Sequence, residues 1–118
     1  MSLPHRGIIW FNVPQSLKHL LERGLVYSIR NKPKPEGLYT LASKYFSPKI
    51  TGYRVMVRFV KKIDDPQDLQ PYLTDSGFQD PIEWWYRANW FKYLHKVTLI
   101  DRVPPEIIRE ALRRAFEI

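Results

Sequence analysis

The sequence contains no cysteine. This absence excludes disulfide bonds, thiolate catalysis and zinc sites with cysteine ligands. The three histidines, His5, His19 and His95, are scattered without the spacing of metal ligands, so we expect no metal site. The chain also lacks a glycine-rich phosphate loop and a Ser/His/Asp pattern. We therefore expect no cofactor, and nothing in the sequence supports catalysis directly.

Long hydrophobic runs are absent as well. A membrane-spanning helix needs about 18 or more consecutive apolar residues, and no run approaches that length. The N-terminal sequence MSLPHRG lacks the apolar stretch of a signal peptide. We therefore expect a cytoplasmic protein without membrane contact. The length of 118 residues, with 44% hydrophobic residues, predicts one domain spanning residues 1–118 with its own core.

Acidic residues are scarce in the first half of the chain. Residues 1–62 contain twelve Lys or Arg and only two acids, for a net charge of +10. Residues 63–118 contain seven basic and ten acidic residues, for a net charge of −3. A concentrated basic surface attracts polyanions, of which nucleic acid is the commonest. The candidate phosphate contacts are Arg30, Lys32, Lys34, Lys44, Lys49, Arg54 and Arg58.

The hydrophobic pattern predicts a mixed α+β domain. Strands are expected at residues 7–12, 25–30, 53–60 and 95–103, and residues 38–46 could form a strand or a short helix. Helices are expected from Pro14 to Gly24, from Pro81, and from Pro104 to the end. In the clearest strand, 53–60, Val55, Val57 and Phe59 share one face, which we expect to be buried. This order predicts a small curved sheet or β-barrel with flanking helices.

Aromatic residues are concentrated between positions 84 and 93. They are Trp84, Trp85, Tyr86, Trp90, Phe91 and Tyr93. A helix that begins near Pro81 places Trp84 and Phe91 on one face, which predicts a core position for both. Trp85 or Trp90 is then left to line a groove, where aromatic rings stack on nucleobases. The alternative interpretation is that all of these rings fill a small core.

The chain has a glycine and an arginine at Gly24 and Arg30, a Tyr-Arg-Val strand that begins at Tyr53, and a closing Pro105-Glu106. Through such features most of the chain resembles the PUA-like superfamily, particularly its ASCH and EVE domains. ASCH domains contain a helix, a glycine and then a strand that ends in arginine, and Gly24 and Arg30 follow this order. The match departs from the pattern, because the spacing is one residue short and Leu25 or Val26 replaces the expected lysine. The EVE-like features are Tyr53-Arg54-Val55-Met56-Val57, the leucines at 69 and 73, Trp84 or Trp85, and Pro105-Glu106.

The resemblance implies a PUA-like fold that binds RNA or a modified base in single-stranded nucleic acid. In that interpretation Arg30, Lys32, Lys34, Arg54 and Arg58 contact phosphate or a base edge, and Trp84, Trp85 or Trp90 stacks on a base. One alternative is a small ASCH-type amidohydrolase acting on a modified nucleoside. Its candidate residues would be Lys32, Glu36 and Thr40, although none lies at the family's positions. The other alternative is a protein-interaction module whose basic half binds an acidic partner.

Overall fold

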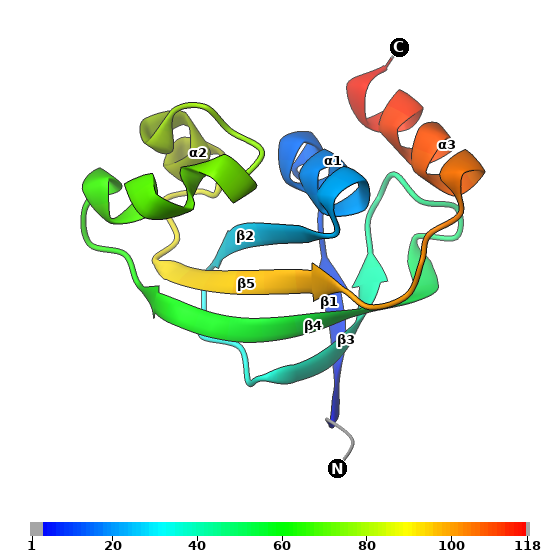
Figure 1. The fold of residues 1–118 in the computed structure, drawn as a ribbon, viewed down its shortest axis with the longest axis horizontal. Helices are drawn as coiled ribbons and strands as arrows, with labels where there is room; N and C mark the ends of the chain where they lie inside the picture. Colours follow the sequence, from blue (N-terminus) through cyan, green and yellow to red (C-terminus); the bar gives the residue numbers. More distant parts are fainter. Residues whose placement is uncertain (1–3, 118) are drawn as a thin grey trace.

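The computed structural model describes residues 4–117 and contains five strands and four helices in that range (Figure 1). The strands are β1 (His5–Trp10), β2 (Leu25–Arg30), β3 (Gly37–Ala42), β4 (Ile50–Lys62) and β5 (Tyr93–Leu99). The helices are α1 (Pro14–Arg23), the 3-10 helix η1 (Pro66–Asp75), α2 (Pro81–Arg87) and α3 (Pro105–Phe116). The predicted α+β class is confirmed, and residues 38–46 are resolved as a strand followed by a turn.

The strands form one mixed sheet in the order β1-β3-β4-β5-β2. β1 runs parallel to β3, and the other neighbouring pairs are antiparallel. Figure 1 shows a strong curvature, with β1 running steeply across the direction of β2, β5 and β4. Among residues 4–117 the edge strands β1 and β2 do not pair with each other, so the sheet is open and the barrel alternative is wrong. β4 is the central strand of the sheet.

Helix α1 forms where its sequence predicts it. Pro14 occupies the first turn, where its missing N–H costs no hydrogen bond. Leu17, Leu20 and Leu21 recur at helical spacing and are buried. Gly24 ends the helix in the left-handed conformation, with φ of 82°, and its N–H donates to the carbonyl of Leu20. The helix therefore places β2 directly after its end.

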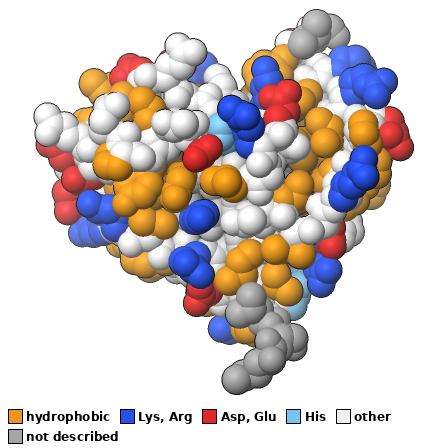
Figure 2. Space-filling view, viewed as in Figure 1, with side chains coloured by type: hydrophobic (Ala, Val, Ile, Leu, Met, Phe, Trp, Pro, Cys, Tyr) orange, Lys and Arg blue, Asp and Glu red, His pale blue; other side chains and the backbone are white. Residues whose placement is uncertain are grey.

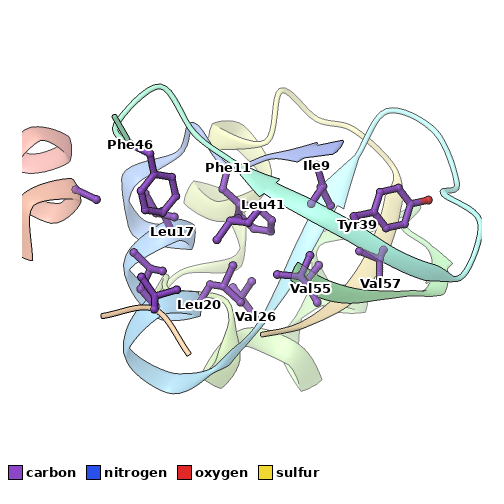
Figure 3. Packing of buried hydrophobic residues seen from close by; sticks show 14 residues of the cluster. Ile9, Phe11, Leu17, Leu20, Val26, Tyr39, Leu41, Phe46, Val55 and Val57 are labelled. Carbon is purple, nitrogen blue, oxygen red and sulfur yellow. The ribbon is translucent and has the colours of Figure 1, made fainter. Parts of the chain in front are cut away.

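The apolar side chains form two separate clusters. The first lies between α1 and the sheet, and Figure 3 shows Leu17 and Leu20 on one side with Val55 and Val57 among the strand residues on the other. The second lies between the sheet, η1 and α2. Its buried members are Ile29, Ile63, Leu69, Phe78, Trp84 and Leu94. The space between these two clusters is where the candidate site is found.

The buried face predicted for β4 is only partly correct. Val55 and Val57 are fully buried, but the side chain of Phe59 is 39% exposed. The pairing of β4 with β5 shifts register between Phe59 and Lys61. Such a bulge bends a strand locally. The ring of Phe59 therefore packs edge-on against His95, with centroids 5.5 Å apart, outside the main core.

Helix α3 is more peripheral than its apolar stripe suggests. Among the described residues of this helix only Ala111 is fully buried, while Ile108 and Leu112 are half-buried. The side chain of Phe116 is exposed. The helix packs against α1 and lies to one side of the sheet (Figure 1), which explains why its stripe is incompletely covered. No helix within residues 4–117 is long and apolar enough to cross a membrane.

Helix α2 is short, and this changes the predicted arrangement of the aromatic residues. Asp80 caps its start by accepting a hydrogen bond from the N–H of Ile82 at 3.1 Å. The helix ends at Arg87, and the next residues turn sharply, with positive φ at Asn89 and Trp90. Phe91 therefore lies beyond the helix and does not share a helical face with Trp84. The core position predicted for Trp84 is confirmed, and the one predicted for Phe91 is wrong.

Candidate functional site

A cavity of about 360 Å³ lies where the two edge strands of the open sheet approach each other. Its walls come from the end of β1, from the end of β2 with the loop that follows, and from α2 with its C-terminal turn. Phe11 belongs to the first core cluster, and Ile29 and Trp84 belong to the second. All three line the cavity. The cavity is therefore a gap between the two clusters, at the point where the sheet fails to close.

Arg30, the last residue of β2, spans the gap between the two edge strands. Its Nη1 donates to the backbone carbonyl of Trp10 in β1 at 2.5 Å. Its Nε donates to Oγ of Ser28 at 2.9 Å, and its guanidinium lies 4.5 Å from the centre of the Phe11 ring. Both acceptors are neutral, and no carboxylate of residues 4–117 forms an ion pair with Arg30. The structure thus fixes a cation in place without a countercharge.

A second cation, Lys34, lines the same cavity from the loop after β2. Burial lowers the pKa of Arg30 to about 10, so the guanidinium remains charged at neutral pH. Burial and the neighbouring charge of Arg30 both lower the pKa of Lys34. Among the residues that the structure describes, no aspartate or glutamate lines this cavity. The cavity is therefore electropositive and suited to an anion.

The buried side chain of His95 holds the Lys34 loop against the sheet. The backbone N–H of Lys34 donates to Nε2 of His95 at 2.9 Å. Nδ1 must then carry the ring proton, and it donates to the carbonyl of Tyr93 at 3.0 Å. Burial, with a smaller contribution from the charges of Arg30 and Lys34, lowers the pKa of His95 to about 4. The neutral imidazole is thus a structural anchor for the loop, a role that an isolated histidine in the sequence does not reveal.

Aromatic rings form both the floor and the rim of the cavity. The floor contains the buried rings of Phe11, Phe78 and Trp84. At the rim, Trp10 is 40% exposed and Phe91 is 37% exposed. Trp10 is not among the residues predicted from the sequence, because a short apolar run such as 7–12 does not show which of its side chains are exposed. The alternation of a half-buried strand could have identified it, since Ile9 points inward and its neighbours do not.

Amide side chains provide further polar groups at the rim. Asn31 and Asn89 are exposed lining residues, and their side chains form no hydrogen bond within residues 4–117. Asn12 is different, because its Oδ1 accepts from the backbone N–H of Lys44 at 2.8 Å. The amides of Asn31 and Asn89 can each donate and accept, which matches the edge of a nucleobase. Arg87 adds an exposed cation beside them.

The remaining predicted basic residues lie outside the cavity. Lys32 is exposed in the loop after β2. Arg54 forms a bidentate ion pair with Asp101, at 2.9 and 3.0 Å, and Arg58 pairs with Glu36 at 3.0 Å. On the face shown in Figure 2, the described Lys and Arg side chains are interspersed with acidic and apolar ones. The cations that the cavity brings together are thus Arg30, Lys34 and Arg87, not the whole predicted set.

Two of the three tryptophans predicted to stack on a base also lie outside the cavity. Trp85 is half-buried, and its Nε1–H donates to the carbonyl of Phe91 at 2.7 Å. Trp90 is 49% exposed and packs edge-on against Trp85, with centroids 5.4 Å apart, and against Tyr86 at 6.0 Å. Because Asn89 and Phe91 line the cavity, Trp90 is an exposed ring adjacent to its mouth.

The residues proposed for amidohydrolase chemistry are engaged elsewhere. Oγ1 of Thr40 is hydrogen bonded to Nε2 of His5 at 3.0 Å, and Glu36 pairs with Arg58. Lys32 is exposed, and none of the three candidates lines the cavity. Within residues 4–117 no cluster of three or more His, Asp or Glu side chains could hold a metal ion. The described arrangement offers binding groups and no evident nucleophile with its base.

Comparisons of the chain with protein-family models, with curated proteins and with solved structures found no match.

Proposed function

We propose that this chain is a nucleic-acid-binding module whose ligand is RNA or another single-stranded nucleic acid, and that the cavity receives one unstacked nucleotide. The observation that carries the proposal is the composition of the cavity. It combines the unpaired cations Arg30 and Lys34 with exposed aromatic rings and contains no described acidic side chain. Single-stranded nucleic acid is bound by this combination, because cations contact the backbone and rings stack on bases.

The rim provides the features that a base requires. Trp10 and Phe91 present partly exposed rings, and stacking on such rings contributes about 1–3 kcal/mol per base. The amides of Asn31 and Asn89 then form hydrogen bonds with the base edge. The strand continues past the mouth of the cavity, where the exposed ring of Trp90 stacks on the next base.

We also propose that the chain is a divergent PUA-like domain. The support comes from the two residues that carry the ASCH resemblance. Gly24 ends α1, and Arg30 ends β2 at the cavity. The arginine of the family pattern thus coincides with the cation that spans the two edge strands. An open, curved sheet with α1 packed on it is compatible with this assignment.

The test is a binding titration of fluorescently labelled single-stranded RNA, followed by fluorescence anisotropy at several salt concentrations. The decisive variant is Lys34→Gln, since it removes a cavity charge while keeping the backbone N–H that binds His95. We expect an affinity loss of about tenfold, and a decrease of about 0.7 in the slope of log affinity against log salt. Lys62→Gln is the matched control, because Lys62 is exposed at the end of β4 and does not line the cavity.

Two results would contradict the proposal. One is an RNA affinity that does not change between dilute and physiological salt, which would remove the electrostatic contribution. The other is an equal loss for Lys34→Gln and Lys62→Gln, which would show that only total charge matters and that the cavity is not the site.

A further inference from the structure

Of the three cations that line the cavity, Arg87 is exposed, whereas Arg30 and Lys34 are both half-buried. This half-buried pair bears on the kind of phosphate that the cavity recognises. We infer that Arg30 and Lys34 together bind a phosphomonoester, the terminal phosphate of a strand end or of a free mononucleotide, in preference to an internal phosphodiester. This inference rests on the proposed function and narrows its ligand. The hydrogen-bonding geometry and the charge of the site both favour a terminal phosphate.

The first step is the hydrogen-bonding capacity left on Arg30. A guanidinium has five N–H donors in a planar fork. The Nε donor is used by Ser28 and one Nη1 donor by the carbonyl of Trp10. Nη2 forms no hydrogen bond within residues 4–117. The fixed fork therefore offers a cavity ligand adjacent unused donors, the geometry in which arginine binds phosphate through two parallel hydrogen bonds.

The second step is the balance of charge. A phosphodiester carries one negative charge, whereas a phosphomonoester carries about −1.5 to −2 at neutral pH. Arg30 and Lys34 are half-buried, lie close enough for the charge of Arg30 to lower the pKa of Lys34, and meet no described carboxylate in the cavity. A single negative charge would leave one of these two cations uncompensated. A phosphomonoester compensates both.

The third step is the rigidity of the two cations. Arg30 is held by two hydrogen bonds and by the ring of Phe11. Lys34 belongs to a loop that is anchored to the buried ring of His95. Fixing the guanidinium of Arg30 and the backbone of Lys34 reduces the conformational entropy lost on binding, and it keeps the two residues from moving apart when only one charge is compensated. Arg58 is not available in the same way, because its guanidinium already forms an ion pair with Glu36.

The experiment compares RNA oligonucleotides of one sequence that differ only at their ends: a 5′-phosphate, a 3′-phosphate, or hydroxyl groups at both ends. At pH 7.5 we expect one phosphorylated form to bind at least about tenfold more tightly than the hydroxyl-ended form. This preference should shrink as the pH falls from about 7 to 5, because the second pKa of a phosphomonoester is about 6. Competition with a nucleoside monophosphate then distinguishes a free nucleotide from a strand end.

Substitutions test whether Arg30 and Lys34 cause the preference for a phosphorylated end. Arg30→Met should abolish the preference for the phosphorylated end, and Lys34→Gln should reduce it. Arg6→Met is the matched control, because Arg6 is an exposed arginine outside the cavity whose Nε donates to the carbonyl of Glu36. It should keep the full preference. If Arg30→Met fails to fold, as judged by circular dichroism, the comparison of Lys34→Gln with Arg6→Met still shows whether the preference for a phosphorylated end depends on the cavity.

The outcomes separate this inference from the proposed function. If phosphorylated and hydroxyl-ended RNA bind equally well and with the same salt dependence, the inference is overturned while RNA binding stands. If none of the oligonucleotides binds in a salt-dependent manner, the proposed function itself fails. If the preference exists but survives both cavity variants, the terminal phosphate is bound elsewhere and the assignment to Arg30 and Lys34 is wrong.

Discussion

The cavity and the outer surface of the protein use the same residue types in different ways. In the cavity, Arg30 is fixed by two neutral acceptors and faces no described carboxylate. On the outer surface, Arg54 and Arg58 each pair with a carboxylate. An arginine that must first lose its carboxylate partner contributes less to binding a polyanion than one without a partner. The environment of each cation, rather than the total charge, therefore indicates where an anion binds.

Two of the tryptophans also differ between the cavity and the outer surface. Trp84 is buried in the floor of the cavity, whereas Trp90 is half exposed beyond its mouth. They lie six positions apart in sequence, yet one stabilises the fold and the other is accessible to a ligand. This contrast between the cavity and the surface can be tested through the stability of variants and through their affinity for RNA.

The largest expected effect is the loss of stability when the buried ring of Trp84 is removed. Trp84→Ala should destabilise the protein by about 3–5 kcal/mol, because it leaves a void in the second core cluster. Trp90→Ala should cost less than about 1 kcal/mol, because its side chain is largely exposed. Urea unfolding of both variants measures the difference. Equal losses would show that the exposed ring supports the fold and that the contrast is wrong.

The second expected effect is a loss of stability in mild acid that depends on His95. The pKa of His95 is about 4 in the folded protein, and its ordinary value is 6.5. As the pH falls, the imidazole is therefore protonated in the unfolded chain before it is protonated in the folded one. The stabilisation is complete above about pH 6.5 and is lost as the pH falls towards 4. Between pH 7 and 4.5 this residue should account for about 2–3 kcal/mol of the decrease.

Comparison with His95→Gln isolates this contribution, because the carboxylates of Asp68, Asp101 and Glu110 also have lowered pKa values and contribute in acid. The free energy of unfolding of the variant should depend less steeply on pH between 7 and 4.5. Parallel curves for the two proteins would show that the histidine is not buried in its neutral form.

The smallest expected effect concerns the paired surface arginines. Arg54→Met and Arg58→Met should each change the affinity for single-stranded RNA by less than about threefold, because each charge is already paired with a carboxylate. Arg30→Met should cost tenfold or more in the same anisotropy titration. A loss for Arg54→Met as large as that for Arg30→Met would place the binding surface on the outer face of the sheet.

The sequence predicted most of the elements because their signals are local. Pro14, the leucine spacing and Gly24 together define α1, and the alternation around Val55 and Val57 defines the central strand. The bulge after Phe59 could not be predicted, since it depends on how β4 pairs with β5. The peripheral position of α3 is also a matter of tertiary packing, because an amphipathic stripe does not show how completely it will be covered.

The candidate site was only partly predictable for a related reason. The basic residues and the aromatic cluster were identified, but their partners were not. Asp101 lies 47 positions from Arg54 in sequence, so the ion pair that distinguishes Arg54 from Arg30 could not be inferred from spacing. Trp10 reaches the site because the sheet is curved, and Phe91 because α2 ends at Arg87. Both depend on the three-dimensional arrangement of distant segments.

The strand order also has a consequence for how the chain folds. β1 is the first strand in sequence, and α1 and β2 lie between it and its partner β3. The parallel pairing of β1 with β3 is therefore non-local. The β3–β4 hairpin is the more local contact and should form early. The two outermost strands, whose ends form the cavity, should therefore dock late. We expect hydrogen exchange to show β1 opening more readily than β4, so that a partly folded chain would retain the hairpin without yet having a place for a ligand.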